Sequence, residues 1–236
     1  MVTMTDRAPN PALTDRLART ELVVLDMAGT TVADDGLVEE AFRTALPGAG
    51  PEQTAYVRAT MGTSKITVFR HLTGGDEARA QQANTAFEHA YARLVDDGHC
   101  APLPGAEETL RRLRDQGRTI ALTTGFARTT QERIIAALGW QGLTDLTLCP
   151  ADAGRGRPHP DMVLTAALRA RVSSVAAVAV AGDTDSDVRT GLNAGAGIVA
   201  GVRTGAHGEE ELRAAGATHV LDSVAALPGL LEAREG

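Results

Sequence analysis

The stretch Glu21-Leu22-Val23-Val24-Leu25-Asp26-Met27-Ala28-Gly29-Thr30-Thr31 decides how the rest of the chain is organised. Its apolar run ends at a carboxylate and is followed by small and hydroxyl-bearing residues. A short apolar run bounded by turn-forming residues is typical of a buried strand in a parallel sheet. Ligands of such sheets bind beyond the carboxyl ends of the strands, so Asp26 is expected where a nucleophile or a metal ligand would act. The same position also suits an aspartate that only caps the next helix.

Beyond residue 100 the chain alternates between apolar runs and helix-forming segments. The predicted strands are 119–124, 146–149, 175–181, 198–202 and 219–221, and the predicted helices are 106–116, 127–138, 160–170, 187–194, 209–215 and 224–233. Strands that alternate with helices imply an α/β fold with a doubly wound parallel sheet and right-handed crossovers.

The segment between the first strand and residue 100 has a different character, because it contains no convincing strand. Helical spacing or good helix formers are found over 37–46, 51–60, 65–72 and 77–95. A stiff Pro-rich linker, residues 101–105, follows. We therefore expect two domains: an α/β core made of residues 1–35 and 101–236, and a helical cap, residues 36–100, inserted after the first strand.

Composition limits the kinds of partner. The net charge is −7 and no block of basic residues is present, which argues against nucleic acid and against a membrane surface. No run reaches membrane-spanning length, so a soluble, cytoplasmic protein is expected.

Aromatic residues make up only 3% of the chain, which predicts a core of Ala, Val and Leu. Residues 1–20 are expected to be a loose extension, and Cys100 and Cys149 to be ordinary thiols.

Polar groups follow four of the predicted strand ends, where they could converge. These groups are Asp26, Thr124 with Gly125, Arg157, and the run Gly182-Asp183-Thr184-Asp185-Ser186-Asp187. A nucleophilic carboxylate, a hydroxyl, a fixed cation and further carboxylates are what phosphoryl transfer requires. Asp26 and Asp183 could hold Mg²⁺, which prefers oxygen ligands. Taken singly, an Asp-rich turn is usually a helix cap and an Arg beside Pro is usually solvated.

In this order the motifs resemble those of the haloacid dehalogenase superfamily, over residues 21 to about 233. Within it the chain is most similar to the phosphonatase-like (phosphonoacetaldehyde hydrolase) subfamily. The resemblance is carried by Asp26-Met27-Ala28-Gly29-Thr30, Thr123-Thr124-Gly125, Gly156-Arg157-Pro158-His159-Pro160, Gly182 to Asp187, and Met61-Gly62-Thr63-Ser64-Lys65 in the cap. Most of the superfamily has lysine where this chain, like that subfamily, has Arg157.

The resemblance implies a role for each motif. Asp26 would attack phosphorus and become an aspartyl-phosphate. Mg²⁺ would be held by Asp26, Asp183 and the backbone carbonyl of Ala28, with Asp187 supporting the metal. The phosphoryl group would be bound by Thr124, Gly125 and Arg157, and the cap would offer Met61, Gly62 and Lys65 to a small-molecule phosphonate or phosphate. The resemblance also suggests a homodimer.

Ala28 and Lys65 favour a phosphonate over a phosphate ester. Ordinary phosphatases of the superfamily carry at position 28 an aspartate that protonates the leaving oxygen, which alanine cannot do. Lys65 is the only lysine in the chain. In phosphonatases the cap lysine forms an imine with an aldehyde, so that carbon leaves as an enamine. The alternative for Lys65 is a solvated side chain, and for Ala28 a weakened activity.

Two departures from the subfamily keep other functions open. The subfamily has a histidine where this chain has Val68 and a tyrosine where it has Phe126, and both are thought to serve imine chemistry. One alternative is a phosphomonoesterase of a small metabolite, and another is a non-catalytic protein that binds a phosphate ligand. His71 is expected to face away from the site, and His159 to lie near its mouth.

Overall fold

The sheet follows the predicted topology. The computed structural model describes residues 19–235, and within them six strands form one sheet in the order β3-β2-β1-β4-β5-β6, with every pairing parallel. The strands are β1 (Leu22–Asp26), β2 (Thr119–Thr123), β3 (Leu146–Leu148), β4 (Val178–Gly182), β5 (Ile198–Val202) and β6 (His219–Leu221). The doubly wound α/β prediction is confirmed. β1 lies in the middle of the sheet, which places the end of the opening stretch at the centre of one edge.

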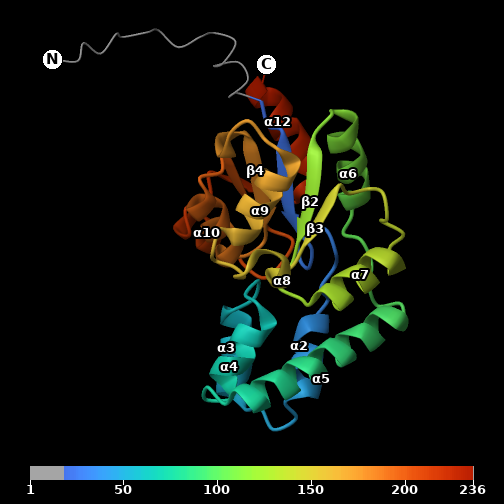
Figure 1. The fold of residues 1–236 in the computed structure, drawn as a ribbon, viewed down its shortest axis with the longest axis vertical. Helices are drawn as coiled ribbons and strands as arrows, with labels where there is room; N and C mark the ends of the chain where they lie inside the picture. Colours follow the sequence, from blue (N-terminus) through green and yellow to red (C-terminus); the bar gives the residue numbers. More distant parts are fainter. Residues whose placement is uncertain (1–18, 236) are drawn as a thin grey trace, which may run out of the picture.

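Helices cover both faces of the sheet, as Figure 1 shows. They are α6 (Ala106–Asp115), α7 (Arg128–Ala137), α8 (Pro150–Ala153), α9 (Asp161–Ala170), α10 (Asp185–Ala194), α11 (Glu209–Ala214) and α12 (Leu227–Glu235). Val23 and Leu25 of β1 share a buried cluster with residues of α6, α7 and α12. Leu22 and Val24 point the other way and pack with α9. A strand buried on both faces must be apolar throughout, which explains the uninterrupted run in β1.

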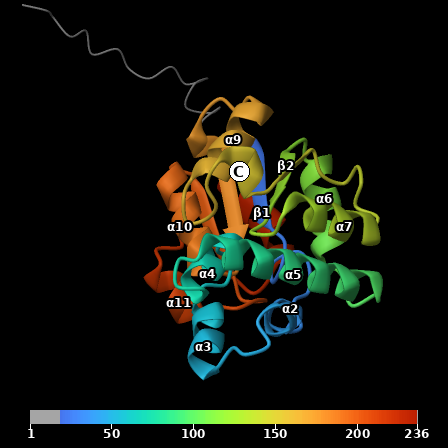
Figure 2. The same cartoon turned by 60° about the horizontal axis from the view of Figure 1, so that its bottom comes forward.

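Four helices lie between β1 and α6 and form the cap: α2 (Leu37–Ala45), α3 (Pro51–Ala59), α4 (Lys65–Leu72) and α5 (Glu77–Asp96). Figures 1 and 2 show them gathered at one end of the core. Their interior is aromatic, since the ring centroid of Phe42 lies 4.7 Å from those of both Phe69 and Phe87. The same buried cluster continues through Phe126 into the core, with 4.5 Å between the centroids of Phe126 and Tyr91. The prediction of an Ala, Val and Leu interior therefore fits the sheet but is wrong for the cap.

Element boundaries differ from prediction where a local hydrogen bond decides them. The predicted strand 175–181 is split into a 3₁₀ turn (Val175–Ala177) and β4. α10 begins at Asp185 and not at 187, because the Thr184 hydroxyl caps the helix by accepting the Asp187 N–H at 3.2 Å. The predicted helix 224–233 is a 3₁₀ turn (Val224–Ala226) followed by α12. α8 was missed because four residues are too few to show periodicity.

The predicted N-terminal extension falls mostly on residues 1–18, which lie outside the described residues. At its end the prediction is wrong for Thr20, which is buried and donates its N–H to Glu235 at 2.9 Å. No helix among residues 19–235 is long and apolar enough to cross a bilayer.

Candidate active site

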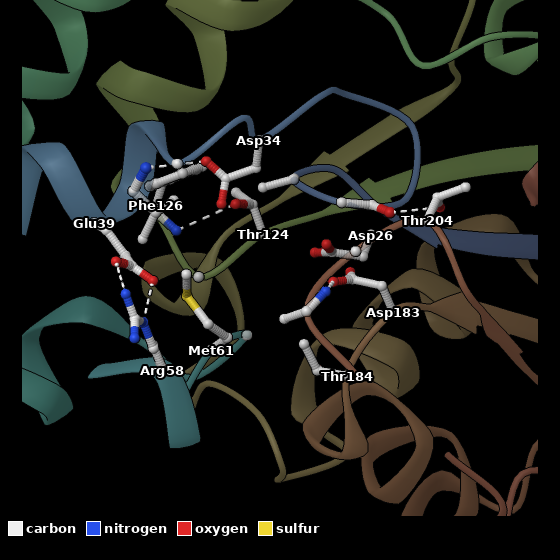
Figure 3. A pocket seen from close by; sticks show the side chains of 18 of the residues that line it. Asp26, Asp34, Glu39, Arg58, Met61, Thr124, Phe126, Asp183, Thr184 and Thr204 are labelled. Carbon is white, nitrogen blue, oxygen red and sulfur yellow. Dashed lines mark hydrogen bonds and ion pairs between the residues drawn. The ribbon is translucent and has the colours of Figure 1, made fainter. Parts of the chain in front are cut away.

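The site lies where the central strands end against the cap. Asp26 is the last residue of β1, its register partner on β2 is Thr123, and Asp183 follows β4 directly. A cavity of about 350 Å³ opens at this edge and is lined by Asp26, Ala28, Asp34, Met61, Gly62, Lys65, Thr124, Gly125, Phe126, Arg157, Asp183 and Thr184, among others. Figure 3 shows Asp26, Asp183 and Thr124 at the cavity, with Met61 reaching it from the cap.

Arg157 lies at the centre of the charged cluster. It is 4% exposed, so the alternative of a solvated arginine is wrong. Its guanidinium is 2.5 Å from the Asp26 carboxylate and 2.9 Å from that of Asp187, and it donates to the Thr123 hydroxyl at 2.9 Å. A planar guanidinium that binds two carboxylates is well oriented for an oxyanion.

Three buried carboxylates surround this one guanidinium. Oxygens of Asp26, Asp183 and Asp187 all lie within 4.8 Å of one another. Burial is the main reason that the pKa of Asp26 is raised to about 7, with Arg157 lowering it and Asp187 raising it. Burial and the two neighbouring carboxylates also raise the pKa of Asp183 well above its usual value. Three carboxylates lie near only one guanidinium, so a bound divalent cation would balance the excess of acidic groups. The oxygen donors are also those that Mg²⁺ prefers, so this set of residues fits a Mg²⁺-type ion.

Ala28 lines the same cavity, and its backbone carbonyl is a fourth candidate oxygen donor. This carbonyl accepts no hydrogen bond from the part of the chain that the structure describes. The side chain of residue 28 adds only a methyl group, so the site offers no carboxylic acid at this position. The four predicted metal ligands, Asp26, Ala28, Asp183 and Asp187, thus lie together.

Asp183 is enclosed by backbone that only glycine permits. A Cβ at Gly29, where φ is +83°, would lie 2.4 Å from the Asp183 carboxylate, and a Cβ at Gly205 would lie 1.9 Å from it. The carboxylate accepts hydrogen bonds from the Thr30 hydroxyl at 3.0 Å and from the Ala206 N–H at 2.8 Å. These neighbours fix the orientation of Asp183, which explains why glycine and threonine follow Asp26 in the opening stretch.

The cap reaches the core through the loop Met61–Ser64, just before α4. A Cβ at Gly62 would lie 2.4 Å from the Thr184 hydroxyl. A Cβ at Gly125 or at Gly156 of the core would lie 2.8 Å from Thr63 or Ser64, respectively. The Lys65 N–H donates to the Gly125 carbonyl at 3.3 Å. Glycines on both sides therefore let the two backbones approach, and the cap is closed over the cavity.

Lys65 is buried, at 6% exposed, so the alternative of a solvated lysine is wrong. Its ammonium lies 5.2 Å from the ring centroid of Phe126, 5.8 Å from that of Phe42 and 5.9 Å from that of Phe87. Within residues 19–235 no carboxylate lies within 4.0 Å of it and no acceptor is within hydrogen-bond distance. Burial lowers its pKa, and the nearby carboxylates of Asp34 and Asp26 oppose that effect. The lowered pKa favours the neutral form of the amine relative to an exposed lysine, and the neutral form is the one that can form a Schiff base.

Three other residues singled out from the sequence can now be placed relative to the cavity. Thr124 lines the cavity, and its hydroxyl accepts the Phe126 N–H at 3.2 Å. His71 stacks on Tyr56 at 3.9 Å between centroids, away from the cavity as expected. His159 is exposed and does not line the cavity, so the expectation that it lies at the mouth is wrong.

The sequence did not reveal four other residues that border the cavity. Thr204 follows β5, and the strand-end rule could have found it. Its hydroxyl donates to the Gly29 carbonyl at 2.7 Å. Glu39 and Arg58 form a two-pronged ion pair at the cap side, at 2.6 and 2.9 Å (Figure 3). Asp34, on the loop between β1 and α2, also faces the cavity.

Comparisons with known proteins agree with this geometry. A model of the haloacid dehalogenase-like hydrolases matches residues 20–195. The chain is 28% identical over 252 residues to the phosphonoacetaldehyde hydrolase of Parabacteroides distasonis, covering 89% of this chain and 95% of that protein. It is 27% identical over 217 residues to a probable phosphatase, IndB, of Dickeya dadantii, covering 90% and 94%. The crystal structure of a phosphonoacetaldehyde hydrolase-like protein from Oleispira antarctica superposes with a TM-score of 0.81 at 25% identity, covering 100% and 96% of the two chains.

Proposed function

The chain belongs to the haloacid dehalogenase-like hydrolases, and from this premise we propose that it cleaves the carbon–phosphorus bond of a small phosphonate carrying a β-carbonyl. Phosphonoacetaldehyde or a close relative is the proposed substrate. The observation that carries the proposal is Lys65: the only lysine of the chain is buried on the wall of the cavity that also holds Asp26, and it has no ion-pair partner within residues 19–235.

The proposed cofactor is Mg²⁺, held by Asp26, Asp183, Asp187 and the Ala28 carbonyl. When bound, the ion would neutralise phosphoryl charge and position the phosphoryl group against Asp26. The close grouping of the three carboxylates and the raised pKa values of Asp26 and Asp183 support this assignment.

Asp26 is the proposed nucleophile. One of its oxygens would attack phosphorus while Arg157, the Thr124 hydroxyl and the backbone at Gly125 hold the other phosphoryl oxygens. The phosphorus–carbon bond breaks as the oxygen–phosphorus bond forms, giving an aspartyl-phosphate that water then hydrolyses. The ion pair between Arg157 and Asp26 supports this arrangement, since the same guanidinium would contact nucleophile and substrate.

Lys65 would make carbon a leaving group. Its ammonium first gives up a proton, and the neutral amine then adds to the carbonyl carbon. When that proton returns and water leaves, a protonated imine remains. When phosphorus departs, the electron pair of the carbon–phosphorus bond moves into the imine and forms a neutral enamine. Protonation of carbon and hydrolysis then release the aldehyde or ketone. No acid at position 28 is needed on this route, which agrees with Ala28.

The cap, proposed to comprise residues 36–100, would act as a lid on a core of residues 1–35 and 101–236. Closure carries Lys65 to the cavity through the Met61–Ser64 loop and excludes water from the imine and the acyl phosphate. The contacts at Gly62 and Gly125 support this role.

A phosphomonoesterase is the second candidate, favoured by the similarity to a probable phosphatase and by the apolar side chains of Val68 and Phe126. Such an enzyme would have to work without an acid at position 28. The substitution Ala28→Asp should then raise ester hydrolysis and leave phosphonate cleavage no faster.

The deciding experiment is borohydride reduction of the protein with phosphonoacetaldehyde and Mg²⁺, followed by mass spectrometry of the cap peptide. Because the chain has a single lysine, only the N-terminal amine competes, and it lies on another peptide. We expect an adduct on Lys65, and loss of phosphonate turnover in Lys65→Arg, which keeps the charge but cannot form an imine. Full phosphonate turnover in Lys65→Arg would refute the imine route. Phosphate release from esters, unchanged in that variant, would then identify a phosphatase.

A further inference from the structure

Asp34 is a carboxylate on the wall of the catalytic cavity for which the proposed function has so far given no use. It lies on the loop that leads from β1 into the cap, eight residues after Asp26 in the chain. One of its oxygens accepts the Val38 N–H at 2.9 Å, at the start of α2. Its side chain reaches into the cavity, as Figure 3 shows.

Chemistry at the Lys65 amine needs a proton acceptor that later returns the proton. The charged groups that act on Lys65 are Asp34, Asp26, Arg157 and Glu88, and Asp34 has the largest effect of the four. Two candidate bases can be set aside. Asp26 is paired with Arg157 at 2.5 Å and is reserved for phosphorus. Glu88 does not line the cavity and accepts hydrogen bonds from the Thr130 hydroxyl and the Ala127 N–H of the core.

Neutral side chains near the amine offer no alternative. The rings around the ammonium belong to Phe42, Phe87 and Phe126, and none carries a polar atom. Val68, on the same helix as Lys65, is buried and apolar. Besides Asp26 and Asp34, three carboxylates of the described residues border the cavity: Glu39 is paired with Arg58, Asp183 accepts hydrogen bonds from Thr30 and Ala206, and Asp35 is exposed. Asp34 is partly buried and shares the cavity wall with Lys65, which makes it the best placed of these carboxylates.

We propose that Asp34 is the general base and acid for imine formation at Lys65, an inference that rests on the proposed function. Lys65 and Asp34 are more than 4.0 Å apart, since no ion pair joins them in residues 19–235. The carbonyl carbon and oxygen of a substrate would occupy the gap. Cap and core would then share the chemistry, with the amine on α4 and its base on the loop that connects the two.

The proton balance follows from this placement. The Asp34 carboxylate first takes a proton from the Lys65 ammonium, which leaves a neutral amine. As that nitrogen bonds to the carbonyl carbon, the carbonyl electron pair moves to oxygen, and Asp34 gives its proton to that oxygen to make a hydroxyl. Asp34 accepts a proton from the ammonium that results. It returns that proton to the hydroxyl, which leaves as water when the nitrogen lone pair forms the imine. Asp34 therefore ends as it began, and no other reactant is consumed.

Burial supports the assignment. It raises the pKa of the Asp34 carboxyl, while the Val38 N–H and Lys65 lower it and Glu39 and Asp35 raise it. A carboxylate whose pKa is raised is a stronger base than an ordinary aspartate, so it takes the proton of the Lys65 ammonium more readily. These four groups, together with burial, would set its titration.

The rival explanation is that Asp34 only caps α2. The cap offers a matched control, because Asp76 accepts the Arg79 N–H at 3.0 Å at the start of α5 and does not line the cavity. Asparagine preserves a capping oxygen at either position and removes the acid–base function. If capping were its only role, Asp34→Asn and Asp76→Asn should behave alike.

The test measures the rate of borohydride-trapped adduct at Lys65, with phosphonoacetaldehyde as the probe, in the full chain with Mg²⁺. We expect Asp34→Asn to slow adduct formation about a hundred-fold with a melting temperature like that of the wild type, and Asp76→Asn to leave the rate unchanged. In Asp34→Ala, added formate should restore part of the rate by replacing the missing carboxylate. A rate in Asp34→Asn within about threefold of wild type, or no formate effect in a folded Asp34→Ala, overturns the assignment. Absence of any Lys65 adduct in the wild type would overturn the proposed function itself, so the two failures are distinguishable.

Discussion

The charged groups on the core side of the cavity have hydrogen-bonding or ion-pair partners, whereas the Lys65 ammonium on the cap side has none within residues 19–235. In the core, Arg157 binds Asp26 and Asp187 at 2.5 and 2.9 Å, and Asp183 accepts two neutral hydrogen bonds. In the cap, Lys65 is surrounded by aromatic rings and has no partner among residues 19–235. Paired groups hold their charge and their geometry, which suits a phosphoryl site. An unpaired amine loses its proton more easily, which suits covalent chemistry.

The largest expected effect comes from removing the proposed nucleophile, Asp26, on the core side. Asp26→Asn should lower turnover at least about a thousand-fold, because no other carboxylate can take its place. Asp185→Asn is the matched control, since Asp185 lies in the same polar run but pairs with Arg189 and does not line the cavity. Phosphate release under Mg²⁺ gives the measurement. Turnover in Asp26→Asn comparable to that of Asp185→Asn would move the chemistry away from the core.

When divalent cations are removed, the free energy of unfolding should fall as the pH rises, because the clustered carboxylates then lose their protons. The folded pKa of Asp26, about 7, lies above its ordinary value of 3.8. Its stabilising contribution is therefore present below the ordinary value and disappears as the pH rises through about 7. At about 1.36 kcal/mol per pKa unit, the loss is on the order of 4 kcal/mol, and Asp183 acts in the same direction.

Thermal unfolding with EDTA and with Mg²⁺, at about pH 5 and about pH 8, checks this prediction. Mg²⁺ should raise the melting temperature much more at the higher pH, and Asp26→Asn should weaken the pH dependence. An equal effect of Mg²⁺ at both pH values would mean that the carboxylates are not its ligands.

Closure of the cap can be weakened without touching a charged group. In Gly62→Ala the new methyl group would meet the Thr184 hydroxyl at 2.4 Å, which forces the cap loop away from the core. We expect kcat/KM to fall about ten- to a hundred-fold because Lys65 is displaced. Gly74 has a similar backbone, with φ of +64° against +80°, but open space around it. Gly74→Ala therefore controls for backbone strain, and an equal loss of kcat/KM in both variants would rule out the closure explanation.

The smallest effects concern the seam between α5 and α7. Glu88 joins the two helices through partly buried hydrogen bonds, so Glu88→Ala should lower the free energy of unfolding by about 1–3 kcal/mol. Arg133 and Asp96 join the same helices at 2.7 Å but are about half exposed, so Asp96→Ala should cost less than about 1 kcal/mol. Urea unfolding of both variants makes the comparison. A larger loss in Asp96→Ala would show that surface charge, and not the partly buried contact, holds the cap.

Much of the core was predictable because strand ends obey a simple geometric rule. Asp26, Thr124 and Asp183 could be placed at one edge from the apolar runs that precede them, since parallel strands end on the same side. Arg157 is predicted at the same edge, but the rule fixes its position less closely, because a loop and the short α8 separate it from β3. Its burial depends on tertiary contacts that leave no trace in local sequence.

The cap was harder to predict for the opposite reason. The spacing of apolar residues gave the bounds of α4 correctly, yet it could not tell that Lys65 at its start is buried. That burial is produced by aromatic side chains from α2, α5 and the loop after β2. Asp34 was missed because two adjacent aspartates before a glycine are typical of a solvated turn.

Because the only lysine is buried, the rate at which a reagent labels it can report how often the cap opens. A reagent that acylates amines can reach Lys65 only when α4 and its loop leave the core, whereas the N-terminal amine serves as an internal clock for the reagent. The ratio of the two labelling rates then measures the equilibrium between closed and open cap, in the same way that hydrogen exchange measures local opening. Any phosphonate, ester or inorganic anion that favours the closed state would lengthen the lifetime of the unlabelled lysine, so ligands could be ranked without knowing which of them is turned over.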